Sequence, residues 1–589
     1  MKLERIIIKN FRRIGDATID LASSAFLIGP NNSGKSSILD AIDALLSLKS
    51  DKVTEEDFRM DLDGKREETI EITGIFSDIS NEISNKRGFK GRVIDEKFTY
   101  KKTYKLNAAS KPKYESIIYP YKIKDEFTGA KIIQDLINAG IDSDIIKEVL
   151  GNKKTSDKLT NGWEKDFIEV IEYQTDEQPV FEENPGGIPA NVNSKLPKLI
   201  RIPSTINMND IESSDKKYIL GECLGILFED LLEKDPLANE IQQKLTELED
   251  HMKPLTDESM MKVLINEVNK LISSVFPNCG IDILPNLQKL SDIIKPKYEI
   301  SIFSNIKTKS NKQGTGLLRT TIFSMLRYHS YLKKEMNIES RPIFVAFEEP
   351  EIYLHPSAAN LLRDTIYSLG VTDQICCSTH SPWMIDLTKE PLSLTRMNLL
   401  CDDSINCINY GLTSTYLKLE EDDKSRIKML QIFDDELSRV FFAEKVIIVE
   451  GDTELLLIRN TLKLLPEDLQ KDILSKYQIV KARGKATIIS LVKYLQDLSI
   501  HPIVMHDRDK GVEGAVKFNE PIKLAINDIG RLILNEEIIE DTLGYSAPSS
   551  DKPYKAFAFS YKWKSVADIP QTWREKIEFI FNINLNNLP

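Results

Sequence analysis

The chain has 589 residues and a mass of 67.2 kDa, enough for about four domains of ordinary size. Hydrophobic residues make up 41% and charged residues 29%, which excludes an intrinsically disordered chain. The formal net charge of −13 argues against a protein that coats nucleic acid by non-specific contacts, although a local basic strip would still suit a nucleic-acid enzyme. No run of about 18 apolar residues, no secretory signal and no metal-binding cysteine spacing is present, so we expect a cytoplasmic protein without membrane segments.

Strands dominate the predicted structure of the first 120 residues. The third of them leads through a short loop into SILDAIDALLSL, whose apolar periodicity predicts a helix. Strands are expected at 6–8, 17–21, 25–28, 69–76 and within 99–120.

Helical periodicity takes over from about residue 130 to 290, with proline and asparagine breaks. Its clearest part is a pair of amphipathic helices within 219–252, whose apolar stripes suit self-association. Further along the chain a long helix is predicted at 315–335. Strands are predicted at 298–304, 343–347 and 374–378.

A polar stretch at 419–427 indicates a domain boundary, after which the pattern changes. From KVIIVEG to PIVMHD the order is strand, helix, strand, helix, strand. This alternation predicts a small parallel sheet with helices packed on it.

A phosphate-binding motif lies between the third predicted strand and its helix. GPNNSGKS, residues 29–36, fits G-x-x-x-x-G-K-S in the strand–loop–helix context that the motif requires. Its glycines let backbone N–H groups approach phosphate oxygens, the Lys35 ammonium faces the β- and γ-phosphates, and the Ser36 hydroxyl is suited to bind Mg²⁺. The expected ATP contacts are Gly29, Asn31, Asn32, Ser33, Gly34, Lys35, Ser36 and Ser37.

Acidic residues follow the strand predicted at 343–347. Glu348 is suited to bind the metal ion of the nucleotide, and Glu349 to activate the attacking water. A charged turn after a buried strand explains both residues without any chemistry. His380, at the end of the strand predicted at 374–378, is placed to sense the γ-phosphate, although a lone histidine is more often structural.

These motifs together resemble the ABC-type ATPase heads of SMC, RecF and double-strand-break-repair proteins. The opening residues, IIIKNFRRIGDATIDL, are similar to the first hairpin of those heads. The signature helix of the family corresponds to residues 312–326, where Gly314 and Gly316 replace the paired glycines and the sequence departs from LSGGQ. The resemblance implies that two heads enclose two ATP molecules, and hence a homodimer or a larger homo-oligomer.

The parallel sheet predicted after the polar stretch carries a second group of carboxylates. Glu450 ends its first strand, and Asp507 and Asp509 end its last. Because the carboxyl ends of parallel strands meet at one edge of a sheet, these side chains are expected to converge, and a hard divalent cation would offset their repulsion. An acidic helix N-terminus and a D-x-D turn explain them without a metal. The arrangement resembles the Toprim domain of topoisomerases, DnaG-type primases and OLD-family nucleases.

An ATPase head that is followed by a Toprim domain is similar to the OLD-family nucleases. On this resemblance Glu454, in EGxxE, is a metal carboxylate, and Glu540 with Asp541 is a late acidic pair for a second metal. The implied chemistry is phosphodiester cleavage with two Mg²⁺ or Mn²⁺ ions.

Lysines of the same part match the family as well. Lys552 in KPYKA corresponds to the late lysine that neutralises developing charge, with Lys555 as the alternative. ARGKA, with Gly484 and Lys485, is similar to a glycine–lysine turn in the middle of the domain.

The resemblance implies an α/β fold in four parts. These are an N-terminal ATPase part with the phosphate loop (1–130), a mainly helical insertion for dimerisation (131–290), a C-terminal ATPase part (291–420) and a Toprim nuclease domain (421–589). The implied function is an ATP-regulated, metal-dependent DNA endonuclease that acts in prokaryotic anti-phage defence. It would act alone, with a UvrD-like helicase as in the Gabija system, or with a retron reverse transcriptase and its RNA-linked DNA.

One alternative is an ATPase switch whose Toprim domain binds nucleic acid or a partner without cleaving. A topoisomerase is disfavoured, because no segment suggests the tyrosine-bearing winged-helix domain that strand passage requires. For DNA contact two basic segments stand out, and solvated strand faces explain them equally well. They contain Lys86, Arg87, Lys90 and Arg92, and Lys101, Lys102 and Lys105 with Tyr100 and Tyr104 between them.

Overall fold

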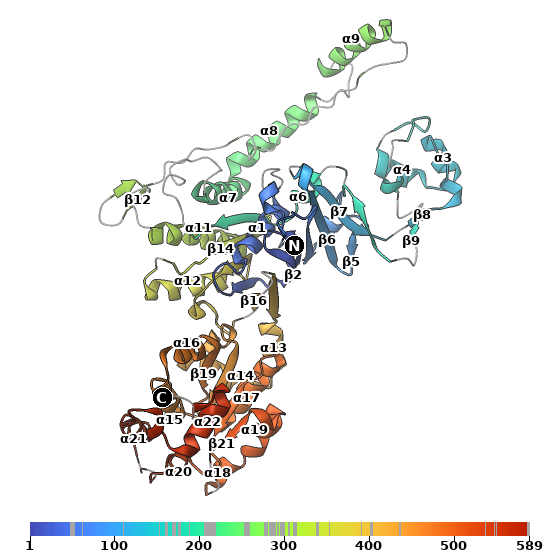
Figure 1. Cartoon of the computed structure of the whole chain (residues 1–589). Coiled ribbons are helices and arrows are strands. Elements are labelled where there is room, and N and C mark those ends of the chain that lie inside the picture. The colour runs from blue at the N-terminus through green and yellow to red at the C-terminus, as the bar shows by residue number, and fades with distance from the viewer. Residues whose placement is uncertain are drawn as a thin grey trace. The chain divides into compact units, whose positions relative to one another are not determined.

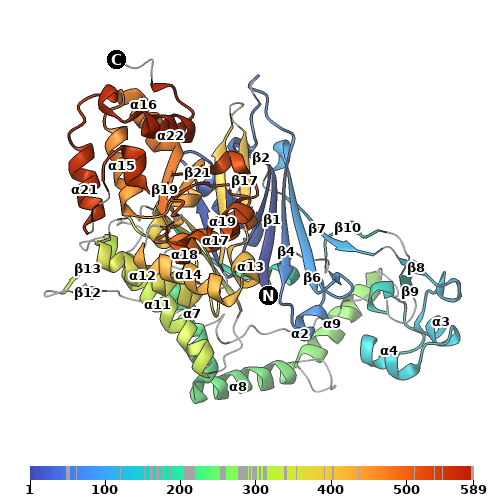
Figure 2. The same cartoon turned by 90° about the horizontal axis from the view of Figure 1, so that it is seen from below.

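The computed structural model describes two compact units of the chain (Figures 1 and 2). The first comprises Met1–Leu21, Pro30–Lys198 and Met397–Asn409, and the second comprises Ala22–Gly29, Leu199–Arg396 and Tyr410–Pro589. Described are residues 1–585 except 48–52, 62, 110, 120, 152, 160–162, 168–171, 175–177, 186, 188, 205–218, 253–259, 276–280, 282–289, 291–293, 295–300, 304–306, 310–314, 337–340, 353, 390–391, 401–403, 435–436, 510, 536, 547 and 549. Within these residues no helix combines the length and the apolar character that a membrane crossing requires.

An antiparallel sheet is the core of the first unit, with its long strands side by side in both views (Figures 1 and 2). The strand order is β10-β7-β6-β4-β1-β2, and β5 pairs with β6. Every second residue of β4, from Ile70 to Phe76, is buried, as expected when one face of a sheet lies against the core. The strands are β1 (Lys2–Phe11), β2 (Ile14–Asp20), β4 (Thr69–Ser77), β5 (Val93–Ile94), β6 (Lys97–Lys105), β7 (Lys113–Ile118) and β10 (Val180–Glu183).

Helix α1 (Lys35–Leu46), which follows the phosphate-binding motif, lies against β1 and β4. Its apolar side chains Ile38, Ile42 and Leu45 are fully buried. Strands as well as helices occur in the segment that the sequence assigns mainly to helices, since β9 and β10 lie there. The remaining elements of this unit are α2 (Asn81–Ser84), α3 (Ile133–Asn138), α4 (Ser143–Leu150), α6 (Pro189–Asn193), the paired β8 (Tyr121–Ile123) and β9 (Glu172–Gln174), and most of β17 (Ile405–Tyr410).

The side chains of β6 alternate between the two faces of the sheet, which corrects part of the proposed DNA-contact set. Tyr100, Lys102 and Tyr104 are buried, with exposed fractions of 0%, 1% and 4%. Arg92 is also buried and donates to the Ser116 hydroxyl and to a Glu182 carboxylate oxygen. These four side chains are therefore part of the interior and not of a DNA-contact surface.

Lys102 instead binds the C-terminal end of α1. Its Nζ donates to the carbonyl oxygens of Ala44 (2.9 Å) and Ser47 (2.6 Å), and the Tyr104 hydroxyl also donates to Ala44 (3.2 Å). The amide of Asn193 donates to the Leu46 carbonyl (2.8 Å). The last carbonyls of a helix have no partners within it, so these side chains satisfy groups that would otherwise be buried unpaired.

We expect a pH-dependent stability contribution from Lys102, whose pKa burial lowers from 10.5 to about 7. Between these values the unfolded chain binds a proton that the folded unit has released, so the free energy of unfolding rises with pH. The difference in the free energy of unfolding between wild type and Lys102→Met should grow in favour of wild type above pH 7, by at most about 1.4 kcal/mol per pH unit. Denaturant unfolding of both proteins at pH 6.5 and 9 measures it, and an equal gap at both values would contradict the assignment.

Parallel strand pairs form the first sheet of the second unit. In the order β11-β14-β15-β3-β16, β14 pairs with β15, and β3 pairs with both β15 and β16, all in parallel. Their consecutive buried residues are typical of strands that are covered on both faces. The strands are β3 (Ser24–Ile28), β11 (Lys198–Ile202), β14 (Ile343–Glu348), β15 (Gln374–Ser378) and β16 (Leu392–Leu399).

Long helices accompany this sheet in the sequence. The pair predicted within 219–252 and the helix predicted at 315–335 are confirmed as α7, α8 and α11. Of the strand predicted at 298–304, residues 301–303 form β12, and the rest lies outside the described residues. The bounds are α7 (Ile219–Lys234), α8 (Pro236–Met252), α9 (Met260–Val275), α11 (Thr315–Met336), α12 (Pro356–Leu369), β12 (Ser301–Phe303) and β13 (Lys307–Lys309).

A second parallel sheet, with the order β19-β18-β20-β21, confirms the alternation predicted near the C-terminus (Figure 1, orange to red). The polar stretch 419–427 forms much of helix α14, whose Asp423 accepts hydrogen bonds from Ser490 and Lys493 of α17. The strands are β18 (Lys445–Val449), β19 (Tyr477–Lys481), β20 (Ile503–His506) and β21 (Leu532–Leu534). The helices are α13 (Leu412–Lys418), α14 (Glu421–Phe433), α15 (Asp452–Leu462), α16 (Glu467–Lys476), α17 (Lys485–Asp497), α18 (Glu513–Val516), α19 (Asn519–Ile526), α20 (Ile539–Leu543), α21 (Lys552–Ser560) and α22 (Gln571–Phe581).

Candidate functional site

The phosphate-binding motif forms a tight loop at the start of α1. Asn32 and Gly34 have φ angles of 66° and 89°, in the left-handed region. The φ angle of Gly34 is one that residues with a side chain rarely adopt, and a Cβ atom there would lie 2.5 Å from Cδ1 of Ile405, so both favour glycine at this position. Lys35 is the first residue of the helix, and its Nζ donates to the Pro30 carbonyl (2.8 Å).

The other residues predicted to contact ATP surround this turn in the sequence. Gly29 directly follows β3, Ser33 is fully buried, and Ser37 is half-buried in the first turn of α1. Asn31 and Ser36 are exposed, so the Ser36 hydroxyl is accessible to a bound ion. The loop has the geometry of an anion-binding helix N-terminus.

Glu348 is the last residue of β14 in the second unit and Glu349 follows it, and the structure gives them different partners. Glu348 accepts from the Arg201 guanidinium and from the backbone N–H of Ser204 (3.2 Å). Glu349 has a φ of 44°, uncommon for a residue with a side chain, and its carboxylate lies 3.7 Å from Nε2 of His380. The parallel pairing of β14 with β15 thus places Glu349 beside His380, and both are predicted to act on ATP.

Arg319 fixes the backbone of this turn. It lies in the first turns of α11, is 1% exposed, and donates to the carbonyl oxygens of Glu349 (2.8 Å) and Ile352 (3.3 Å). Gly316 lies one turn earlier in α11, whereas Gly314 lies outside the described residues. Neither arginine is predicted from the sequence: Arg319 lies in the signature-like segment 312–326, where only the glycines stand out, and Arg201 belongs to no motif.

The predicted carboxylates of the C-terminal sheet gather at its carboxyl edge. Glu450 directly follows β18, and Glu454 lies in the first turn of α15. Asp507 and Asp509 follow β20, and Glu540 lies in α20. Carboxylates from four segments of the chain therefore share one edge of a parallel sheet, where such folds place their sites.

Hydrogen bonds connect these segments. The Glu450 carboxylate accepts from the backbone N–H of Asp507 (3.3 Å), and Glu454 accepts from the N–H of Gly451 (3.1 Å). The Asp507 carboxylate accepts from the side-chain amide of Asn535 (2.7 Å), which is fully buried. Asn535, directly after β21, was not identified from the sequence, and a lone asparagine after a short strand gives no signal of this role.

Burial and mutual repulsion raise the pKa values of three of these acids. Burial is the largest cause for each, and it raises the pKa of Glu450 to about 7, of Glu454 to about 8 and of Asp507 to about 6. Charge repulsion adds to it, from Asp507 on both glutamates and from Asp509 and Glu540 on Asp507. The groups are thus close enough to resist simultaneous ionisation unless a cation is present.

Glu540 gives the strongest indication that a cation belongs here. Its side chain is fully buried, and neither carboxylate oxygen has a hydrogen-bond partner among the described residues. A buried carboxylate without partners is costly, so the donor set fits a hard divalent ion. Lys552, the predicted late lysine, has its Nζ 4.0 Å from Glu540, whereas Asp541 and Lys555 are exposed.

Asp509 has a different partner from the other acids. Its carboxylate pairs with Nζ of Lys485 (2.8 Å), a buried lysine that also donates to the side chain of Asn519 (3.0 Å). The glycine–lysine turn predicted from the sequence, Gly484 and Lys485, thus brings the ammonium group of Lys485 to the site. His506 is the fully buried last residue of β20, and burial lowers its pKa to about 4.

Glu450, Glu454 and Asp507 are held by N–H groups in the orientation that the structure records. In the described part of the chain, no three acidic, histidine or cysteine side chains already surround one point as ligands. An ion would therefore be held after rotation of the side chains of Glu450, Glu454, Asp507 and Glu540. For the first three, a metal bond would replace a hydrogen bond.

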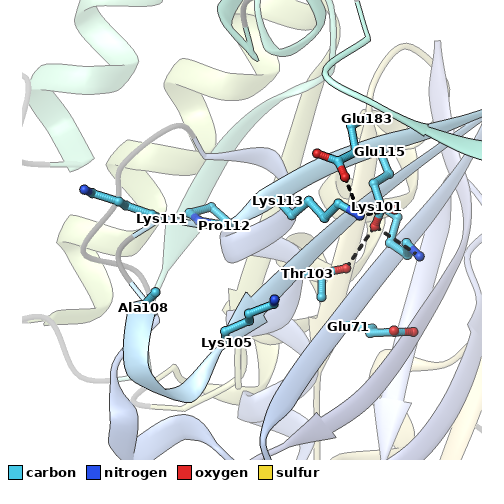
Figure 3. A pocket seen from close by; sticks show the side chains of 10 residues that line it. All are labelled: Glu71, Lys101, Thr103, Lys105, Ala108, Lys111, Pro112, Lys113, Glu115 and Glu183. Carbon is cyan, nitrogen blue, oxygen red and sulfur yellow. Dashed lines mark hydrogen bonds and ion pairs between the residues drawn. The ribbon is translucent and has the colours of Figure 1, made fainter.

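A basic pocket of about 520 Å³ lies on the outer face of the first unit's sheet (Figure 3). Lys101, Lys105, Lys111 and Lys113 contribute to its lining. Lys101 pairs with Glu115 (3.1 Å) and Lys113 with Glu183 (2.8 Å), so part of this charge is neutralised. Of the predicted DNA-contact set, Lys105 is exposed on this strand and Lys101 is partly buried on the same face.

A phosphate loop at a helix start, an acidic end of a buried parallel strand and a carboxylate-lined second sheet define an ATPase joined to a Toprim domain. Comparison with protein families agrees. The AAA ATPase domain model matches residues 1–385, and the model of the overcoming-lysogenization-defect-protein-like TOPRIM domain matches residues 441–509. The chain belongs to the AAA ATPase domain family and, with its OLD-like Toprim domain, is an OLD-family protein.

Curated relatives match most of the chain. The Old nuclease of Escherichia phage P2 is 24% identical, covering 86% of this chain and 77% of its own. The OLD nuclease of Thermus scotoductus is 22% identical over 98% of both chains. Endonuclease GajA of Bacillus cereus is 23% identical, covering 92% of this chain and 82% of its own.

Among solved structures, an SMC head bound to the C-terminal winged-helix domain of ScpA matches at 13% identity with a TM-score of 0.35. It covers 71% of this chain and 100% of that chain. The family models and the relatives together support an enzyme that combines an ATPase with a nuclease.

Proposed function

We propose that this protein is an ATP-regulated DNA endonuclease that depends on divalent metal ions. The observation that carries the proposal is the group of buried acids at the edge of the Toprim sheet. Glu540 in particular is buried without a hydrogen-bond partner in the described structure, which a purely structural domain does not require. The nuclease names of the relatives support the same activity.

Each residue of the Toprim site has a role in this proposal. Glu450, Glu454, Asp507 and Glu540 would hold Mg²⁺ or Mn²⁺ ions, which would supply an activated water and a Lewis acid for phosphodiester hydrolysis. Asn535 orients Asp507 through its side-chain amide, and Lys485 orients Asp509. Lys552 is half-exposed with its Nζ 4.0 Å from Glu540, and it is proposed to neutralise charge on the cleaved phosphate.

Incubation of the purified protein with supercoiled plasmid tests this function. We expect nicking or linearisation with Mg²⁺ or Mn²⁺ and none in EDTA, and ATP is expected to change the rate. Plasmid that remains intact under all conditions, beside normal ATP hydrolysis, would favour a switch whose Toprim domain binds without cleaving.

We expect Mg²⁺ to raise the melting temperature more at pH 8 than at pH 6. The raised pKa values of Glu450, Glu454 and Asp507 mean that the folded, metal-free site retains protons that the unfolded chain releases. This stabilisation is complete below their ordinary values near 4 and is lost as pH rises through about 6 to 8, where a bound ion replaces the protons.

Calorimetry of wild type in EDTA and in Mg²⁺ at both pH values measures the effect. Asp507→Asn is the control, because it removes a ligand charge and should lose most of the shift. An Mg²⁺ shift of the same size at both pH values, or in Asp507→Asn, would contradict a metal site formed by these acids.

ATP is proposed to act through residues 29–37, Glu348, Glu349 and His380. The resemblance to SMC-type heads implies that a second copy completes each ATP site, so we propose a homodimer or a larger homo-oligomer. Helix α8 exposes Leu237 (64%) and Leu248 (50%), as a self-associating helix would. Light scattering with ATP present measures the mass, and a monomer would contradict this proposal.

DNA is the proposed substrate, and prokaryotic anti-phage defence in the cytoplasm is the proposed setting. The exposed Lys105 and Lys111 of the basic pocket suit contact with the phosphate backbone (Figure 3). A UvrD-like helicase or a retron reverse transcriptase with its RNA-linked DNA is the proposed partner. Co-purification from cells that express the neighbouring genes, and phage plating on cells with wild type or the Asp507→Ala variant, test partner and setting.

A further inference from the structure

Glu351 is an acidic residue close to the proposed ATPase residues, and the proposed function gives it no task. It lies two residues after Glu349, in the turn between β14 and α12. Burial raises the pKa of its carboxyl group. Its Oε2 atom is buried and has no hydrogen-bond partner among the described residues, while Oε1 has two donors.

Both donors come from the loop after the neighbouring strand β15. The Thr379 hydroxyl donates to Oε1 of Glu351 at 2.7 Å, and the backbone N–H of His380 donates to the same oxygen at 3.2 Å. Thr379 is fully buried, and its hydroxyl oxygen also accepts from the N–H of Ser381 (3.0 Å). One carboxylate oxygen therefore organises three consecutive residues, of which the middle one is His380.

The imidazole of His380 has a different partner from its backbone N–H. Its Nε2 is 3.7 Å from the Glu349 carboxylate, whose own backbone is fixed by Arg319. The position of the imidazole relative to Glu349 thus depends on the loop that Glu351 binds. A shift of about 1 Å at such a place can cost a hundredfold in rate.

We propose that Glu351 is a positioning residue for ATP hydrolysis, which acts by holding the Thr379–Ser381 loop so that His380 stays beside Glu349. The inference rests on the proposed ATPase function and adds a residue to it. A turn-stabilising role alone would lower the stability of the protein without any dependence on His380.

A double-mutant cycle with the full chain tests the proposal. Glu351→Ala is expected to lower kcat for ATP hydrolysis roughly 10- to 100-fold, with KM and ATP affinity changed less than about threefold. Glu351→Gln keeps an acceptor oxygen at the position of Oε1 and should stay within a few-fold of wild type. In a His380→Ala background, Glu351→Ala should have almost no further effect, because the two residues act as one unit.

Hydrogen exchange of residues 374–386 provides a readout that is independent of turnover. Faster exchange is expected in Glu351→Ala and not in Glu351→Gln. Wild-type kcat in Glu351→Ala, or losses that multiply fully in the double variant, would overturn the proposal. If wild type itself does not hydrolyse ATP, the proposed ATPase function fails, and unchanged exchange in Glu351→Ala would then overturn the positioning role as well.

Discussion

Asp507→Ala is expected to reduce DNA cleavage by about 10³-fold or more, with ATP hydrolysis close to that of wild type. Asp507 follows β20, is bound by Asn535 and repels both Glu450 and Glu454. Its loss removes a ligand from the centre of the acidic group, and the activated water is lost with the ion. Plasmid nicking and phosphate release, measured on the same preparation, separate the two activities.

Asp468→Ala is the matched control for this variant. Asp468 is an exposed acid of the same domain, in α16, so its removal changes the net charge equally without touching the site. It should cleave DNA at the wild-type rate. Full cleavage by Asp507→Ala would remove the nuclease site from this domain and leave a binding role in its place.

Glu349→Gln is expected to bind ATP with nearly wild-type affinity and to hydrolyse it about 10²- to 10³-fold more slowly. The amide keeps the size of the side chain beside His380 but cannot accept a proton from water. Lys35→Ala, which removes the ammonium group at the start of α1, should instead weaken ATP binding itself. Titration with a fluorescent ATP analogue and steady-state phosphate release distinguish these two defects.

Hydrolysis at the wild-type rate in Glu349→Gln would contradict its role as general base and make Glu348 the candidate. The Arg201 guanidinium already binds the Glu348 carboxylate, so Glu348 needs a separate test. Glu348→Gln is therefore expected to weaken the response to Mg²⁺ more than the chemical step.

The residues found from the sequence are those whose chemistry is local. The phosphate loop depends on its own backbone and on the helix that follows it, and Glu450 and Asp507 follow strands whose alternation with helices is visible in the chain. Parallel pairing then brings their side chains to one edge, as the fold class requires. The coarse architecture could be predicted for the same reason.

The residues missed are those whose partners are distant in the sequence. Arg201 meets Glu348, and Asn535 meets Asp507, only after folding, and neither residue is unusual for its own segment. The strand β6 is a different case, since its period of two separates Lys102 from Lys101 and Lys105. The predicted DNA-contact set takes this segment as one basic group and ignores the alternation that divides its side chains between two faces.

The contacts at the C-terminal end of α1 have a thermodynamic consequence for the phosphate-binding loop at its N-terminal end. Lys102, Tyr104 and Asn193 hold the last carbonyls of the helix against the sheet, so the helix is seated before any nucleotide arrives. A ligand at the N-terminus then spends little of its binding free energy on ordering the protein. In Lys102→Met the C-terminal end of α1 would be held less firmly, and ATP binding would then include the free-energy cost of ordering the helix. This would follow although no atom of Lys102 touches the nucleotide-binding loop.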